Sequence, residues 1–305
     1  MKEMKGTIRT AFSLVFVVLL LTIGISTSAQ EAIGISVGYE YIPHVNFADP
    51  EPGLEDVEIQ LNTWSIGAAF PLSFAEGNTL LLNSVNYQRL GFNYKGWQSG
   101  MGERITQTHS ISYSAFLLQT LTERWKLVIL VAPGVASDLE GELSTYDFTL
   151  SAIVGAMRAF GEKNNFTLGA GLAYTWDFGD PIPMPFLYVD WNIGSKLNIN
   201  GILPTNLAIT YKLFSFIDVG LLASIGGNRY HGDPDKFVVD NPQMKYSLAT
   251  VGPKVQIHFS KWLHLNLESG YTIFRNFSFW DGPTEESNFD MENTFYFRAS
   301  TVIGM

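Results

Sequence analysis

Charged side chains recur at matched positions along the last three segments of the chain. If Ser260-Lys261 closes a tight antiparallel hairpin, counting outward from that turn places Lys254 opposite Glu268. The same row, continued onto the final segment, brings Arg298 beside Glu268. Lys254, Glu268 and Arg298 therefore predict a belt of alternating charge on one face of a sheet.

Two interpretations of this belt remain open. Rings of charged side chains select solutes in pores, so the belt would be a constriction that filters by charge. Alternatively, it is an internal ion-pair network that stabilises the wall, because buried charges need partners.

The same hairpin pairs His258 with His264 close to its turn. Two imidazoles on one face raise the question of a metal site, but no third ligand lies within reach by sequence, and protein zinc sites use three or four. We therefore expect neither a metal nor a cofactor. No serine, histidine and acid arrangement suggests a nucleophilic triad, so we expect no enzyme; a lipid-modifying enzyme is the weaker alternative.

The segments that carry these residues alternate between apolar and small or polar side chains, which predicts β-strands. The clearest are 166–177, 262–275 and 293–305, and each sets aliphatic and aromatic residues against glycine, threonine and serine. Similar alternation is found in 32–42, 58–70, 79–90, 103–118, 125–137, 146–160, 184–194, 215–227 and 244–260.

The connections between these segments alternate between short turns and longer polar loops. Loops are expected at 43–57, 91–102, 138–145, 178–183, 228–243 and 278–291. Short turns at one end and long loops at the other are typical of membrane β-barrels, whose apolar residues face lipid and whose polar residues face a lumen. We count fourteen strands, or twelve if the short hairpin at 197–203 and 207–213 does not span the membrane.

Composition agrees with this fold class. The chain of 305 residues has no cysteine, 28 glycines, 14% aromatic residues and 16% charged residues, against about 25% charged in a typical soluble domain. Its net charge of −10 argues against nucleic acid as a partner. Lys2, Lys5 and Arg9 precede the apolar run 11–25, so we expect a signal peptide over 1–29 and a single barrel domain over 30–305, with no plug domain.

The leader, the alternating strands and the final segment Phe295–Met305 resemble outer-membrane β-barrels of Gram-negative bacteria. The Leu203-Pro204 turn before a strand containing Tyr211 is similar to an uncharacterised family of such barrels, a domain of unknown function. The resemblance implies an outer-membrane location and recognition by the barrel-assembly machinery. Barrels of this kind usually end on an aromatic residue, whereas this chain ends on Met305.

Taken together, these patterns predict an outer-membrane barrel with both termini periplasmic. We expect a passive pore for small or apolar solutes, with the belt of Lys254, Glu268 and Arg298 at its constriction, next to His258 and His264. The alternative is a non-conducting barrel that acts through its acidic loops, where carboxylates meet lipopolysaccharide through divalent cations. The acidic loop residues are Asp49, Glu51, Glu55, Asp56, Asp233, Asp235, Asp240, Asp281, Glu285, Glu286 and Asp290.

Overall fold

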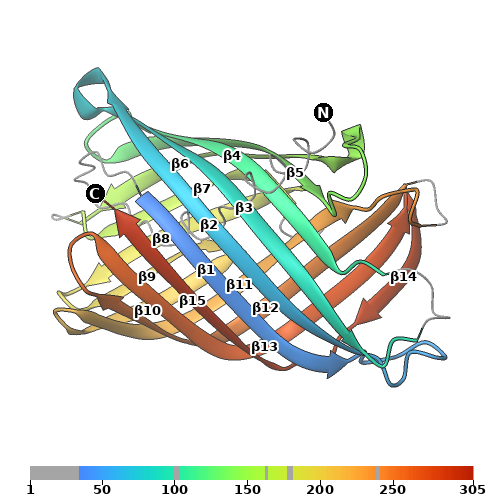
Figure 1. Ribbon diagram of the computed structural model, residues 1–305. Helices are drawn as coiled ribbons and strands as arrows, with labels where there is room; N and C mark the ends of the chain where they lie inside the picture. Colours follow the sequence, from blue (N-terminus) through green and yellow to red (C-terminus); the bar gives the residue numbers. More distant parts are fainter. Residues whose placement is uncertain (1–33, 99–103, 162–163, 177–180, 238–240, 305) are drawn as a thin grey trace, which may run out of the picture.

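A computed structural model describes residues 34–98, 104–161, 164–176, 181–237 and 241–304. The expected signal peptide lies outside these residues. The described chain is a closed barrel of tilted antiparallel strands with loops at both ends (Figure 1). In this part of the chain, no helix is long and apolar enough to cross a membrane.

The described residues form fifteen strands. They are β1 Gly34–Asn46, β2 Glu58–Phe74, β3 Thr79–Lys95, β4 Gln107–Thr120, β5 Trp125–Ser137, β6 Phe148–Phe160, β7 Phe166–Thr175, β8 Ile182–Ile193, β9 Leu197–Leu203, β10 Asn206–Phe214, β11 Ile217–His231, β12 Pro242–His258, β13 Leu263–Asp281, β14 Thr284–Asp290 and β15 Phe295–Gly304. Apart from two one-turn 3-10 segments, η1 Ala75–Gly77 and η2 Thr145–Asp147, the described residues contain no helix, so they hold no plug domain.

Fourteen of these strands make the wall. Each pairs with its sequence neighbours, and β15 closes the barrel by pairing with both β13 and β1. The remaining strand, β14, pairs only with the distal part of β13 and stands at the end of the barrel that carries the longer loops, called the loop end below (Figure 1). The short β9–β10 hairpin is part of the wall, because β9 pairs with β8 and β10 with β11. The expected count of fourteen is therefore confirmed, and twelve is wrong.

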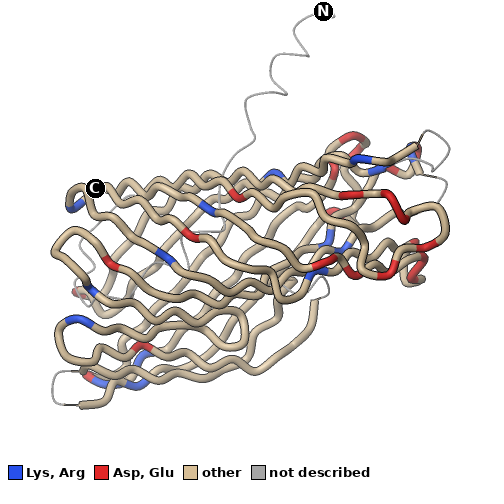
Figure 2. The backbone as a smooth tube through the Cα atoms, turned by 90° about the horizontal axis from the view of Figure 1, so that it is seen from below, with Lys and Arg blue, Asp and Glu red and all other residues tan. Residues whose placement is uncertain are grey.

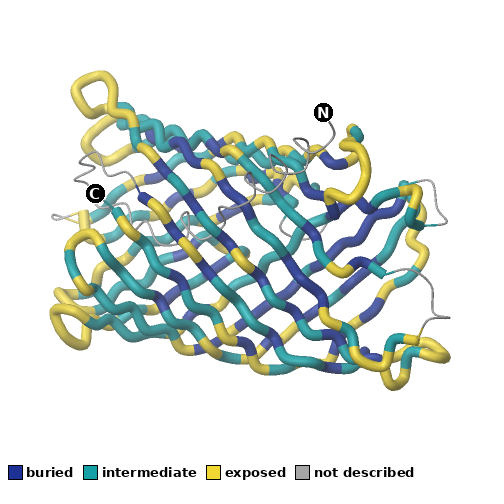
Figure 3. The backbone as a smooth tube through the Cα atoms, in the orientation of Figure 1, coloured by how far each residue is buried: buried dark blue, intermediate teal, exposed yellow. Residues whose placement is uncertain are grey.

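Burial alternates along the strands, as the sequence pattern predicts (Figure 3). In β7, Leu168, Leu172 and Tyr174 are exposed on the outer face, whereas Gly169 and Ala173 are buried toward the lumen. An apolar outer face is what a barrel in lipid requires, because the hydrocarbon core offers polar side chains no partners. The opposite end of the barrel, called the turn end below, carries the chain ends of the described wall, where Gly34 pairs with Gly304.

Glycines in β6 and β7 leave room for one aromatic ring that packs against the inner face of the wall. Phe186 of β8 lies over Gly155 and Gly171, and a Cβ added at Gly171 would come 2.1 Å from the Val154 carbonyl oxygen and 2.6 Å from the Phe186 ring. Any larger residue would collide with backbone here. The glycines of β6 and β7 therefore serve close packing of the wall.

The expected loop at 278–291 is wrong in extent. β13 continues to Asp281 and turns back through β14, so the hairpin occupies most of that range. β13 also carries a bulge, where the register with β12 shifts between the pairs Ala249–Phe274 and Thr250–Thr272. A bulge reverses the side-chain alternation beyond it, so Arg275 and Phe277 point inward although the pattern before the bulge assigns odd positions to lipid.

Acidic side chains gather at the loop end, where Figure 2 shows most of the Asp and Glu residues. The loop-end rim is held together by the ends of β5 and β11, which touch where Ser137 meets His231. Asp138 strengthens this contact, since its carboxylate accepts hydrogen bonds from the amides of Glu140 (3.1 Å) and Asp233 (3.0 Å). Asp240 lies outside the described residues.

Candidate functional site: the lumen

The structure brings the predicted charged belt together inside the barrel. Lys254 is the cross-strand partner of Glu268, and Glu268 is the partner of Arg298. Arg298 Nη1 donates to Glu268 Oε2 at 2.8 Å, and its Nε donates to Glu40 Oε2 at 2.8 Å; Nη2 also bonds Glu40. Arg298 thus binds two carboxylates at once, and with Lys254 the belt contains two cations and two anions.

His258 and His264 are also paired, near the turn end. Their Nδ1 atoms lie 2.8 Å apart, and His258 Nε2 lies 2.9 Å from Asp218 Oδ2. Asp218 comes from β11. Asp218, His258 and His264 therefore form a hydrogen-bonded chain that links β11, β12 and β13. Within the ranges that the structure describes, no group of three or more His, Cys, Asp and Glu side chains is arranged to hold a metal ion.

The turn end of the lumen is polar. A cavity of about 200 Å³ opens there between β8, β9, β10 and β11, and its lining includes Asn192, Asn198, Thr210, Lys212 and Asp218. Asn198 continues this polar lining, since it donates to Asp190 at 2.8 Å and to Asn192 at 3.1 Å. On the turn-end side of the belt, the lumen therefore offers hydrogen-bonding groups and room for water molecules.

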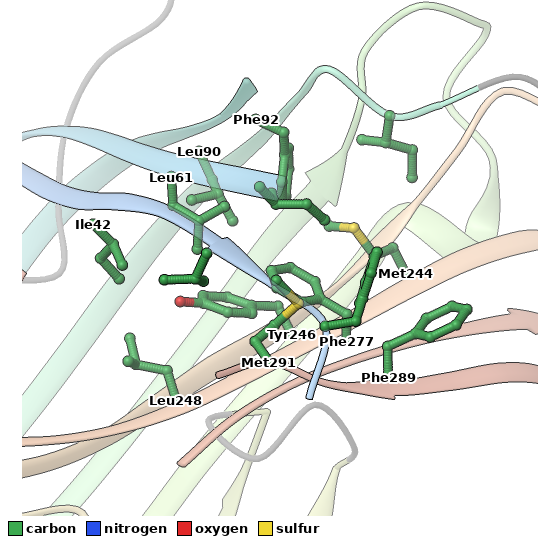
Figure 4. Packing of buried hydrophobic residues seen from close by; sticks show 14 of the residues in the cluster. Ile42, Leu61, Leu90, Phe92, Met244, Tyr246, Leu248, Phe277, Phe289 and Met291 are labelled. Atoms are coloured by element: carbon green, nitrogen blue, oxygen red, sulfur yellow. The ribbon is translucent and has the colours of Figure 1, made fainter. Parts of the chain in front are cut away.

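The loop end of the lumen is filled by apolar side chains, contrary to the expectation of a small and polar lining. Buried residues from nine strands converge there, namely β1, β2, β3, β5, β11, β12, β13, β14 and β15; Figure 4 shows part of this cluster. Phe277 stacks on Tyr246 (ring centroids 4.6 Å apart) and meets Phe92 edge to face (5.8 Å). This apolar closure comprises Ile42, Val45, Phe47, Val57, Ile59, Leu61, Leu90, Phe92, Ile105, Ala136, Tyr230, Met244, Tyr246, Leu248, Phe277, Phe289, Met291 and Tyr296.

One charged residue lies in the apolar closure. Arg275 of β13 is 1% exposed, and none of its three guanidinium nitrogens forms a hydrogen bond of normal geometry. Its electrostatic neighbours are Tyr246 and Glu40. The Tyr246 hydroxyl is likewise buried without a hydrogen-bond partner. Arg275 is therefore a buried cation whose donors are unused.

Sequence reasoning missed Glu40, Asp218 and Arg275, for different reasons. Glu40 faces Arg298 because the first strand pairs with the last, and only the assumption of closure with a definite register would have revealed it. Asp218 reaches His258 across the β11–β12 register, which the long connection between those strands does not fix. Arg275 requires the bulge, for which the sequence carries no clear signal.

The closed antiparallel wall and its apolar exterior define a fourteen-stranded membrane β-barrel. The chain belongs to the family described as Domain of unknown function (DUF6268), whose sequence profile matches residues 25–305. No curated protein matches the chain in sequence.

Solved structures with a similar fold are outer-membrane barrels. An outer membrane channel from Pseudomonas putida F1 is 10% identical with a TM-score of 0.45, over 90% of this chain and 95% of the other. The P. putida toluene transporter TodX is 9% identical (TM-score 0.40; 90% and 89% covered), and P. putida OprB is 8% identical (TM-score 0.36; 90% and 94%).

Proposed function

We propose that the protein is an outer-membrane channel for small apolar or amphipathic solutes, with its lumen shut at the loop end in the conformation described here. The apolar closure carries the proposal. Porin interiors are polar because they conduct water and ions, whereas here the passage between the loop end and the belt is lined by aliphatic, aromatic and methionine side chains. Such a lining favours apolar solutes over ions.

In this proposal the belt lies beneath the closure. Arg298 is held by Glu40 and Glu268, so the belt presents little net charge to a passing solute. It is the narrow section where a solute leaves the apolar lining for the polar turn end. The loop end faces outward and the termini face the periplasm, since in outer-membrane barrels the longer loops are extracellular.

Entry of an apolar fluorescent probe, N-phenylnaphthylamine, tests the proposal. Intact Gram-negative cells exclude this probe, so cells that carry the folded barrel should take it up faster than cells without it. Heat-modifiable gel mobility establishes folding first. Equal uptake by both, with a folded barrel present, would contradict the channel.

A second candidate is a non-conducting barrel that acts through its acidic loops. The filled loop end favours it, because Ile42, Val57 and Met244 are completely buried in the apolar closure. This candidate predicts no probe entry and no discrete current steps in planar bilayers. It also predicts that neutralising the acidic loop residues weakens binding to lipopolysaccharide in the presence of a divalent cation.

A further inference from the structure

Arg275 has no counter-charge of its own. The two cations of the belt, Lys254 and Arg298, are matched by Glu40 and Glu268, and Arg298 occupies both carboxylates through hydrogen bonds. An isolated buried charge costs several kcal/mol, and buried charges are normally paired or coordinated. A buried guanidinium whose three nitrogens form no regular hydrogen bond is therefore suited to bind an anionic ligand.

The surroundings of Arg275 specify the rest of that anion. The Tyr246 hydroxyl forms no hydrogen bond of regular geometry, and it lies beside the guanidinium, with which it interacts. Tyr246 itself belongs to the apolar closure, which also contains Phe92, Phe277 and Met244 (Figure 4). A guanidinium binds a carboxylate through two parallel hydrogen bonds. The site thus offers polar groups for one carboxylate and surrounding apolar side chains for the body of the molecule.

The closure contains residues that can yield to such a ligand. Met244 and Met291 both belong to it and are almost fully buried. Methionine side chains have three rotatable bonds and adapt to irregular shapes, which is why they recur at adaptable binding surfaces. Displacing these two side chains creates room without moving the strands.

We propose that Arg275 and Tyr246 bind the carboxylate of an amphipathic monocarboxylic acid, whose apolar body displaces part of the closure. This inference rests on the proposed channel and names the class of solute. The acid comes either from an aromatic solute or from a lipid-derived alkyl chain, since both present one carboxylate on an apolar body. Binding neutralises Arg275 and loosens the closure in the same event.

Calorimetric titration of the refolded full barrel in a nonionic detergent tests the site. Two acids are compared with their own neutral amides: 4-phenylbutyrate for the aromatic source and laurate for the lipid source. We expect at least one acid to bind about tenfold more tightly than its amide or better. Equal affinity of each acid and its amide would overturn the proposal.

The variant R275M separates binding from folding. It should lose the preference for acid over amide, yet unfold at a denaturant concentration no lower than the wild type, because it replaces an unpaired charge by an apolar chain. Y246F should keep part of the preference. R89Q is the matched control, since Arg89 faces outward and bonds Gln107, and it should bind as the wild type does. An unchanged preference in R275M would refute the site.

The inference and the channel can fail separately. Acid binding that depends on Arg275, without probe entry in cells, would retain the site and contradict the channel. Probe entry without any preference for the acid would retain the channel and refute the site.

Discussion

Phe92 of β3 and Phe277 of β13 meet edge to face inside the barrel, with ring centroids 5.8 Å apart. Their strands are not neighbours in the wall, because β2, β1 and β15 lie between them. The contact therefore bridges the lumen rather than following the sheet. The contact between Phe92 and Phe277 thus joins two separate parts of the wall through the apolar closure.

Removing the Phe277 ring should open the closure. F277A leaves a gap beside Tyr246 and Phe92, and we expect discrete current steps in planar bilayers that are larger and more frequent than those of the wild type. The lost packing should also lower the unfolding free energy by about 3 kcal/mol. I273A is the matched control on the same strand, because Ile273 is 57% exposed on the outer face. Current steps from F277A no larger than those from I273A would contradict the closure.

The belt should contribute to stability through Arg298. E40Q removes the charge that Arg298 meets across the seam between β15 and β1, so we expect the unfolding free energy in urea to fall by about 1.5–3 kcal/mol, the range for hydrogen bonds to charged groups. E268Q should have a similar effect. E123Q, in an exposed turn, should stay within about 0.5 kcal/mol of the wild type. Full stability of E40Q combined with altered ion selectivity would instead favour a filter.

Gly171 should tolerate no side chain. A Cβ there meets the Val154 carbonyl and the Phe186 ring, so G171A should refold with lower yield and unfold at a lower urea concentration. Gly226 of β11 provides the comparison, because a Cβ at that position has no heavy atom within 4 Å. G226A should behave as the wild type does. If the two variants were equally stable, crowding of the β6–β7 wall would not be the reason for its glycines.

The loop-end rim should respond to pH through Asp138. Burial raises the pKa of this carboxyl above its ordinary value of 3.8, although the Glu140 and Asp233 amides oppose the shift. The carboxyl therefore contributes most to stability when protonated, below 3.8, and this contribution is lost as pH rises through the folded-state pKa.

D138N cannot ionise and should lack this dependence. Hydrogen exchange of the Asp233 amide, corrected for the intrinsic effect of pH, should show wild-type protection that falls relative to D138N as pH rises. A constant difference between the two proteins across the acidic range would show that ionisation of Asp138 does not govern the rim.

Much of the wall could be predicted from the sequence because its rules are local. Strict alternation identified the strands, and the tight turn at Ser260-Lys261 fixed the register that pairs Lys254 with Glu268 and His258 with His264. What required the structure was non-local. Glu40 meets Arg298 only through closure of the barrel, and the inward direction of Arg275 and Phe277 depends on one bulge. The apolar closure follows from that reversal together with residues from eight other strands.

Reversible linkage of the bridging contact tests the central claim, that solutes pass through the apolar closure. The chain has no cysteine, so in F92C/F277C a short bifunctional methanethiosulfonate joins these two positions alone within the barrel. We predict that N-phenylnaphthylamine enters cells carrying this variant, that linkage stops entry, and that reduction restores it, while treated wild type is unaffected. Entry that continues unchanged in the linked, folded barrel would contradict passage through the lumen.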